Sequence, residues 1–362
     1  MSKVLITGDL HLHAHRNDQR RADDGLLCLE WIYKTAKDNG IKTVIFVGDF
    51  FHNRFLINTY TASRAFEFLY SQSILDSAEE LSGDVDVNTI FVLGNHDLFF
   101  EDSWKYHSLK AVNKWATVID KPTQMFVENV CADFLPYTPT PTKWIHQPPF
   151  DKPSRVLFSH LSILDAILNT KYNILSVEDD TREKEVIKAE ILHKWEKVWL
   201  GHYHCGQKVS ERVEYIGSPM QLTFGEAGDT KHVALFDLQT LETQYIPNPI
   251  SPQFYIVKNE KSLDNLQLKD AYVQLNFAID KKFELRKKLN KLGVREVEFG
   301  ANSLSSRTNN ETSKTLDNIS SLFLDKDKLI DSYMEALQHL PSHLDRDLLK
   351  KIGKEIVHSV MC

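Results

Sequence analysis

The sequence predicts an α/β fold for residues 1–250, in which short buried strands alternate with helices. Five apolar runs rich in β-branched and aromatic residues are typical of strands that are buried on both faces. Helical stretches separate several of these runs, and this order favours layers of helices packed on sheets. After residue 209 the pattern changes to strands joined by turns.

The five predicted strands are short apolar runs bounded by polar residues. A run of this length indicates a strand, because a helix in a globular domain usually needs about ten residues or more. The runs are KVLIT (3–7), TVIFV (43–47), TIFVL (89–93), RVLFS (155–159) and KVWL (197–200).

The helix predicted between the first two strands covers residues 26–40, LLCLEWIYKTAKDNG. It should end at Asn39–Gly40, because a left-handed residue commonly terminates a helix. Further helices are predicted around 60–76, 103–115 and 181–195.

Two segments of unusual composition predict domain boundaries in this chain of 362 residues. IPNPISP (246–252) contains three prolines and suits an extended connector. Ser, Asn and Thr dominate residues 301–321, which predicts a flexible linker. We therefore expect a main domain at 1–250, a small domain at 251–300 and a C-terminal segment at 322–362.

Amphipathic helical patterns occur in the two predicted C-terminal parts. Residues 271–299 predict a strand, a helix and a strand, and the helix has a basic face that by itself is typical of a solvated surface. Residues 325–340 and 343–360 predict a helical pair that packs back on the main domain or docks on a partner. The helix within 271–299 has Leu285, Leu289 and Leu292 on its apolar face and Lys281, Lys282, Arg286, Lys287, Lys288 and Lys291 largely on the other.

The composition excludes several classes of protein. With 42% hydrophobic and 26% charged residues, the chain is not expected to be disordered, collagen-like or a disulfide scaffold. No apolar run approaches the ~18 residues of a membrane span, and we expect no signal peptide. The four cysteines include no CxxC pair, so a cytoplasmic location is expected.

The formal net charge of −7 is unevenly distributed. Residues 1–250 carry 25 basic and 34 acidic side chains, and the remainder carries 18 and 16. The negative total argues against a nucleic-acid partner, since phosphate binding depends on Lys and Arg. Cations held by aspartates would reverse that local charge, however, and the basic residues near the C-terminus would remain available to DNA.

Polar residues follow all five predicted strands, as GDLHLH, GDFFH, GNHD, FSH and GHYH. The carboxyl ends of strands in α/β sheets are where functional groups converge. Any one of these short motifs is common in turns, but five in order after strand-like runs predict a metal site. The candidate ligands are Asp9, His11, Asp49, Asn95, His160, His202 and His204.

Imidazole and carboxylate ligands without thiolates suit Mn²⁺, Fe²⁺ or Zn²⁺. Seven ligands are too many for one ion and suit two, if one carboxylate is shared. Two ions about 3.5–4 Å apart bind a phosphoryl group and activate water, which predicts phosphoester hydrolysis. His96 is a candidate for assisting the leaving oxygen, with Asp97 holding its imidazole in the required tautomer.

These motifs resemble the calcineurin-like metallophosphoesterase superfamily, whose pattern is D-x-H, G-D, G-N-H-D/E, H and G-H-x-H. The resemblance covers most of residues 1–250 and implies two packed sheets flanked by helices. It also implies that Asp9, His11, Asp49 and His204 hold one ion and that Asp49, Asn95, His160 and His202 hold the other, with Asp49 shared.

Within the superfamily the chain is similar to the SbcD family of DNA-repair nuclease subunits. GDFFHNR, GNHD and EYIGSPMQLTFGE carry this resemblance, which implies that His52 lies near His96 and helps to engage the DNA phosphate. The chain departs from the family at His13, where glycine is usual, so His13 is either a loop residue or an extra phosphate contact.

The SbcD resemblance implies a Mn²⁺-dependent DNA nuclease with 3′-to-5′ exonuclease and single-strand endonuclease action. It further implies a small domain over the DNA, C-terminal helices that bind an SbcC-like ABC-type ATPase, and a homodimer within a heterotetramer for recombination or double-strand-break repair. A metallophosphatase or cyclic-nucleotide phosphodiesterase would share every ligand. A non-catalytic DNA-end scaffold and self-association of the C-terminal helices are the remaining alternatives.

Overall fold

In the computed structural model the chain divides into two compact units. The first comprises Met1–Leu275 and Leu285–Glu298, and the second comprises Asn276–Glu284 and Phe299–Cys362. The described residues are 2–13, 18–73, 87–164, 166–167, 185–279, 281–300, 348–349 and 351.

One large sheet of the first unit has the strand order β14-β13-β1-β2-β3-β6. Strands β1, β2, β3 and β6 run parallel to one another, whereas β13 pairs antiparallel with both β1 and β14. The order places β13, from late in the sequence, beside the first strand. The bounds are β1 (Lys3–Thr7), β2 (Thr43–Val47), β3 (Asn88–Val92), β6 (Thr117–Ile119), β13 (His232–Asp237) and β14 (Thr243–Pro247).

The other large sheet has the order β11-β12-β10-β9-β8-β7. Strands β8, β9, β10 and β12 are parallel, and the edge strands β7 and β11 pair antiparallel. The bounds are β7 (Thr123–Val127), β8 (Val130–Leu135), β9 (Val156–His160), β10 (Lys197–Gly201), β11 (Gln207–Lys208) and β12 (Val213–Tyr215).

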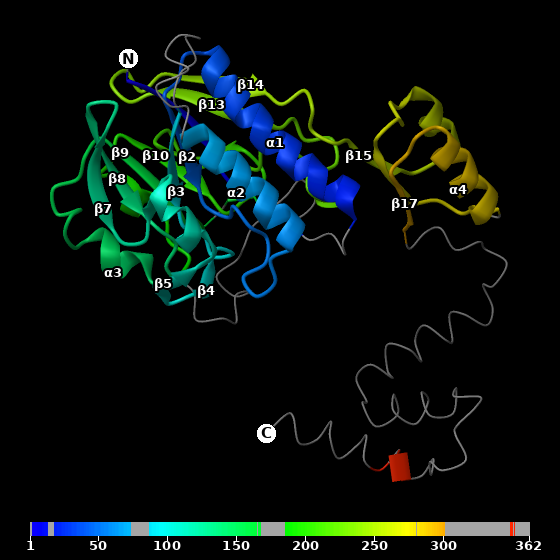
Figure 1. Ribbon diagram of the computed structural model, residues 1–362, viewed down its shortest axis with the longest axis horizontal. Coiled ribbons are helices and arrows are strands. Elements are labelled where there is room, and N and C mark those ends of the chain that lie inside the picture. Colours follow the sequence, from blue (N-terminus) through cyan, green and yellow to red (C-terminus); the bar gives the residue numbers. More distant parts are fainter. Residues whose placement is uncertain are drawn as a thin grey trace. The chain divides into compact units, whose positions relative to one another are not determined.

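The two sheets pack face to face between layers of helix. Val4 and Ile6 of β1 face the apolar layer between the sheets, together with Phe158 and Trp199. Leu5 faces the other way, toward the cluster that includes helices α1 (Gln19–Asp38) and α2 (Thr59–Ser73). Figure 1 shows these two helices side by side over the sheet that contains β1, β2 and β3. The expectation of two packed sheets flanked by helices is confirmed.

Shorter elements complete the described fold. A third cluster of buried residues covers the outer face of the second large sheet, and α3 contributes Ile145 to it. The hairpin of β4 and β5 follows the GNHD motif, and a three-stranded sheet of order β15-β16-β17 follows β14. The bounds are α3 (Pro141–Ile145), β4 (Leu98–Phe100), β5 (Ser103–His107), β15 (Phe254–Val257), β16 (Tyr272–Leu275), α4 (Lys282–Lys291) and β17 (Glu296–Phe299), with 3₁₀ helices at Ser108–Lys114, Ala189–Leu192, Phe224–Glu226 and Glu260–Asn265.

All five predicted strands form within one residue of the expected bounds. Helix α1 begins at Gln19, earlier than expected, because the Asp18 side chain accepts hydrogen bonds from the N–H groups of Arg20 and Arg21. It ends at Asn39 and Gly40 as predicted, with Gly40 at a φ of 64°.

Two predicted helices are wrong in the described residues. Residues 103–107 form β5, because Trp104 and Tyr106 favour a strand that pairs with β4 across a tight turn. Within 181–195, the backbone of Ile187 is hydrogen-bonded to Ser162 and Leu164, so this tertiary pairing replaces the expected helix and only 189–192 form a 3₁₀ turn.

In the C-terminal part, the predicted strand–helix–strand pattern at 271–299 is confirmed by β16, α4 and β17. Leu285 and Leu289 are buried, whereas Leu292 is half exposed and does not belong to the apolar face. The predicted linker at 301–321 and the helix at 325–340 lie outside the described residues, as does most of the helix at 343–360. The boundaries near 250 and 301 stay predictions. No helix in the described part of the chain has the length and apolar character that a membrane crossing requires.

Candidate metal centre

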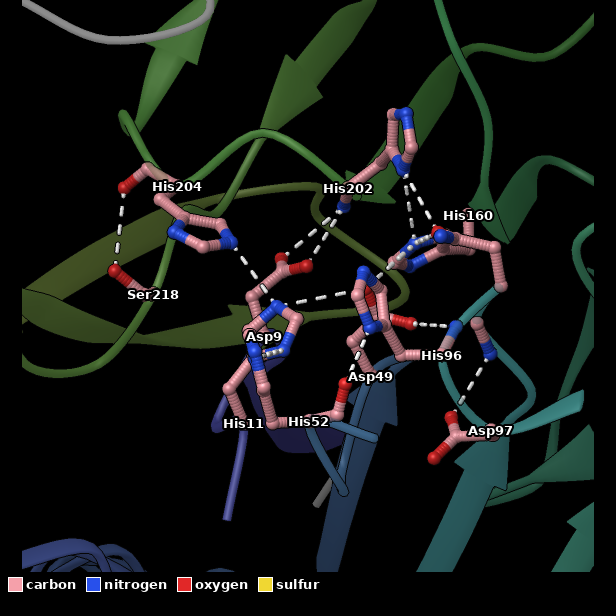
Figure 2. Close-up of polar contacts among 12 residues, drawn as sticks. Asp9, His11, Asp49, His52, His96, Asp97, His160, His202, His204 and Ser218 are labelled. Atoms are coloured by element: carbon pink, nitrogen blue, oxygen red, sulfur yellow. Dashed lines mark hydrogen bonds and ion pairs between the residues drawn. The ribbon is translucent and has the colours of Figure 1, made fainter. Parts of the chain in front are cut away.

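The predicted ligands lie at the carboxyl ends of strands from both large sheets. Parallel strands bring these ends to one edge of each sheet, and the face-to-face packing brings the two edges together. Figure 2 shows the imidazole and carboxylate groups converging on a common centre. Asp9 and His11 follow β1, Asp49 follows β2, Asn95 follows β3, His160 ends β9, and His202 and His204 follow β10.

Glycines before the polar residues permit this close approach. A Cβ atom at Gly48 would lie 2.1 Å from Nδ1 of His160, and one at Gly94 would lie 2.2 Å from Oδ1 of Asp49. Neither distance is compatible with a side chain. The glycines therefore allow strands of different sheets to place their ligands within a few ångströms of one another.

The ligands form two clusters with Asp49 between them. The ligating atoms of Asp9, His11 and His204 lie within 4.8 Å of one another, as do those of Asp49, His160 and His202. Oδ2 of Asp49 lies 3.4 Å from Nε2 of His11 in the first cluster and 3.4 Å from Nε2 of His160 in the second. Asn95 belongs to the second cluster, since its Oδ1 is 3.0 Å from ring nitrogens of both His160 and His202.

The donor chemistry of both clusters fits divalent cations. Nδ1 of His160 contacts the carbonyl oxygen of Val47 at 2.8 Å, so Nδ1 carries the proton and Nε2 directs a lone pair toward the oxygens of Asp49 and Asn95. Nε2 of His204 similarly lies 3.0 Å from Nε2 of His11. Imidazole nitrogens and carboxylate and amide oxygens gathered at these distances suit a divalent cation as their common partner.

Burial and neighbouring charges shift the pKa values of the candidate ligands. Burial raises the pKa of Asp9 to about 6, although His160 and His204 oppose this. Burial alone would lower the pKa of His160, but the neighbouring Asp49 raises it to about 9. Burial also lowers the pKa of His11 well below its usual value and that of His202 to about 3. Asp49 thus favours positive charge at the position between the two clusters.

His96 lies at the rim of the first cluster beside His52. Its backbone N–H donates to Oδ1 of Asp49 at 2.8 Å, and its Nδ1 contacts the carbonyl oxygen of His52 at 2.5 Å. The two imidazole rings stack with their centroids 5.3 Å apart. Nδ1 of His52 is 3.3 Å from Nδ1 of His11. The predicted proximity of His52 and His96 is therefore present.

The expected role of Asp97 in holding the His96 imidazole is wrong. Asp97 is buried, and its carboxylate accepts hydrogen bonds from the backbone N–H groups of Phe50 and Phe51 at 3.2 and 3.3 Å. It also accepts from the N–H of Gly94 at 3.0 Å. Burial, with a contribution from Asp49, raises its pKa to about 7. Asp97 joins the loops after β2 and β3, while the carbonyl of His52 contacts the His96 ring.

A cleft of about 580 Å³ opens beside the first cluster. Its walls include arginines from the start of α1 and from the segment before β17, which the sequence analysis did not single out. The adjacent arginines at the start of α1 were the sequence signal that could have indicated this cleft wall. His13 also lines the cleft, and its ring lies against that of His52 with centroids 4.3 Å apart. The histidines and arginines that line the cleft are His11, His13, His52, His204, Arg20, Arg21 and Arg295.

Glu226 is a second residue that the sequence analysis did not assign. Its Oε1 lies 3.0 Å from Nδ1 of His204, on the side of the ring away from the ligands. Although Glu226 is in the segment EYIGSPMQLTFGE, it is far from His204 in sequence, and no spacing rule connects the two.

Three comparisons relate the chain to known proteins. The sequence model of the calcineurin-like phosphoesterase family matches residues 2–224. Exonuclease subunit 1 of Enterobacteria phage T4 is 27% identical over 256 residues, which span 68% of this chain and 68% of that protein. A solved structure described as a novel archaeal phosphodiesterase covers 68% of this chain and 99% of its own, with a TM-score of 0.34 and 13% identity.

Proposed function

The chain belongs to the calcineurin-like phosphoesterase family, and from this premise we propose that it is a DNA nuclease that hydrolyses phosphodiester bonds. The observation that carries the proposal is the position of Asp49, 3.4 Å from a histidine of each ligand cluster. A shared carboxylate of this kind suits two cations acting on one phosphorus centre. The similarity to an exonuclease subunit supports DNA as the polymer that is cleaved.

We assign Asp9, His11, Asp49 and His204 to one cation and Asp49, Asn95, His160 and His202 to the other, and we propose Mn²⁺ for both. When bound, the cations would supply Lewis-acid stabilisation of the phosphate and an activated water. The protein's own contribution is to hold seven donors in fixed positions at the edges of two rigid sheets.

His96 is proposed to donate a proton to the departing oxygen from Nε2. Its Nδ1 is engaged by the carbonyl of His52, which fixes the ring and directs Nε2 away from the backbone. His52, stacked on His96, is proposed to contact a nonbridging phosphate oxygen. His13 lies against His52 in the cleft, and we propose it as an additional contact to the same DNA strand.

The cleft supports an anionic polymer as substrate. Arg20 and Arg21 lie in the first turn of α1, and both line the cleft together with Arg295. Asp18, Glu296 and Glu298 also line it, so its cationic groups are interspersed with carboxylates. Arg21 also lies 5.1 Å from the ring centroid of Tyr272, which holds the guanidinium in place. Cations along the cleft would position the phosphate backbone, with the exposed basic face of α4 as a further proposed contact.

The decisive experiment is degradation of linear duplex DNA, end-labelled on either strand, with Mn²⁺ or Mg²⁺. We expect metal-dependent release of nucleotides, with 3′-to-5′ polarity and with nicking of single-stranded circles. Hydrolysis of small phosphoesters or cyclic nucleotides without any degradation of DNA would instead identify a phosphatase or cyclic phosphodiesterase. Metal-independent binding of DNA ends without either reaction would identify a scaffold.

We further propose that residues 322–362 bind an SbcC-like ABC-type ATPase in DNA recombination or repair, in the cytoplasm of a bacterium or of a phage host. The protein named as similar is itself a subunit, which supports a partner. Deletion of 322–362 should abolish co-purification with the candidate ATPase while metal-dependent cleavage by the isolated subunit persists. Retained co-purification, or a change in self-association alone, would contradict this role of the segment.

A homodimer is proposed through an aromatic surface beside the site. Phe55 and Leu56 are 72% and 67% exposed, and the β4–β5 hairpin adds Phe99, Phe100 and Tyr106, each about half exposed. Contiguous exposed apolar groups of this kind are typical of protein interfaces. Light scattering should give twice the chain mass, and Phe55→Glu with Phe100→Glu should give a monomer. A monomeric parent protein would contradict the proposal.

A further inference from the structure

A buried ionic cluster lies directly behind His204. Glu226 and Lys231 are 2% and 5% exposed, and Ser218 is 1% exposed. Nζ of Lys231 lies 2.8 Å from Oε2 of Glu226, and Oγ of Ser218 donates to the same oxygen at 3.0 Å. The backbone N–H of Leu222 is a third donor to Oε2, at 3.3 Å. Three donors thus fix one oxygen of this carboxylate and leave Oε1 directed at Nδ1 of His204.

Lys231 also connects this cluster by a hydrogen bond to the backbone of His204, the proposed ligand. Its Nζ donates to the carbonyl oxygen of His204 at 2.9 Å and to Oγ of Ser218 at 3.0 Å. Both the ring and the main chain of His204 are therefore attached to the same pair of charged residues. A buried charge is costly unless it is fully paired, so a pair placed here is expected to contribute more than packing.

We propose that Glu226, held by Lys231, is a positioning residue that fixes the tautomer of His204, so that Nδ1 carries the proton and Nε2 is presented to a cation. A carboxylate that accepts from the distal nitrogen of a ligating histidine orients the ring and increases the basicity of the ligating nitrogen. The inference rests on the proposed function only in taking His204 as a ligand.

The second cluster gives a contrast within the same molecule. Nδ1 of His160 contacts a backbone carbonyl, that of Val47, rather than a carboxylate. A neutral carbonyl fixes the tautomer but donates less electron density to the ring than a carboxylate does. The two cation positions should therefore differ in affinity, and Glu226 should affect the position formed by Asp9, His11 and His204 while leaving the other unchanged.

The test counts Mn²⁺ bound to the full chain in the absence of DNA, by titration calorimetry and by electron paramagnetic resonance. The wild type should bind two ions, and Glu226→Gln should weaken one of them about 10–100-fold while the other is unchanged. The matched control is Glu214→Gln, which breaks another buried Glu–Lys pair, with Lys197 at 2.5 Å, and touches no proposed ligand. The control should lose stability and keep both affinities.

A second readout reports the tautomer without any metal. Long-range ¹⁵N–¹H correlation spectra should show the His204 proton on Nδ1 in the wild type and on Nε2, or exchanging between both nitrogens, in Glu226→Gln. If that variant does not fold, Ser218→Ala, which removes one donor to Glu226 without leaving a buried charge unpaired, should show the same changes on a smaller scale.

The outcomes separate the two proposals. Failure of the wild type to bind Mn²⁺ would overturn the proposed function. A wild type that binds two ions, with equal affinities and an unchanged His204 tautomer in Glu226→Gln, would overturn the positioning role alone. Equal weakening of both ions by Glu226→Gln and by Glu214→Gln would show a structural effect and would also overturn it.

Discussion

Four of the proposed ligands adopt left-handed backbone conformations. Their φ angles are 50° at Asp9, 47° at His11, 51° at Asp49 and 105° at His202. Residues other than glycine enter this region rarely, at a cost on the order of 1 kcal/mol each. The strand-end turns thus direct these side chains inward against their own backbone preference, which is typical of residues kept for function rather than for stability.

Substitutions at Asp49 and at His96 should affect different steps, namely cation binding and proton transfer. Asp49→Asn removes the charge between the two ligand clusters, so we expect most Mn²⁺ binding and all cleavage to be lost. His96→Ala should keep Mn²⁺ binding and reduce cleavage about 10²–10⁴-fold, because only a proton donor is removed. Calorimetry and single-turnover cleavage measure the two effects, and full nuclease activity of Asp49→Asn would exclude a shared ligand.

His107 should make stability depend on pH independently of the metal centre. It is 8% exposed, neither ring nitrogen has a partner among the described residues, and burial lowers its pKa from 6.5 to about 4. The folded protein therefore binds its proton less readily than the unfolded chain. The associated stability is complete above pH 6.5 and is lost as the pH falls toward 4.

The measurement is urea unfolding of the wild type and His107→Leu at pH 7 and pH 5. Between these values the wild type should lose about 1 kcal/mol more than the variant, after allowance for partial solvent screening. Parallel losses in the two proteins would show that His107 is accessible to protons in the folded state.

At the scale of elements, the N-terminus of α1 contributes both to the stability of the helix and to the wall of the cleft. Asp18 caps the helix through the N–H groups of Arg20 and Arg21, whose side chains line the cleft. Asp18→Ala should cost about 1 kcal/mol of stability and should raise the KM for DNA more than it lowers kcat. Asp38→Ala, at the exposed far end of α1, is the control and should change stability by less than about 0.5 kcal/mol.

Elements with a local signal in the sequence were predictable. The five central strands were correctly located because each is a short apolar run buried on both faces, and the ligands follow from the turns at their ends. Strand β5 was mistaken for the start of a helix because its strand conformation depends on pairing with β4, which the run itself does not reveal. The segment around Ile187 was mistaken for a helix because its hydrogen bonds go to residues more than twenty positions away.

The candidate ligands of the site were predictable from the sequence, but the contacts that support them were not. Seven candidate ligands could be named because each stands beside a predicted strand, and the fold then brings them together. Their supporting contacts could not, since the carboxylate that meets His204 comes from a 3₁₀ turn and the carbonyl that meets His96 comes from another loop. Asp97 likewise bonds to backbone groups, which carry no sequence signal.

At the scale of the molecule, cation binding should stabilise the packing of the two large sheets. The ligands come from β1, β2 and β3 of one sheet and from β9 and β10 of the other, so each cation would contact both. Free Mn²⁺ at 100 times its dissociation constant should add about 2.7 kcal/mol per site. Calorimetric melting with Mn²⁺ and with chelator measures this, with Asp49→Asn as the unresponsive control. An unchanged wild-type Tm would contradict the assignment.

The place of β13 beside β1 has a consequence for synthesis on the ribosome. Strand β1 is translated before the other described strands, but its antiparallel partner ends at Asp237, and the last proposed ligand, His204, also comes late in the chain. More than two hundred residues must therefore be translated before His204 can join Asp9 and His11 in the first cluster. The proposed metal centre of a nascent chain is consequently incomplete, and it can form only when nearly the whole of the two-sheet body has emerged.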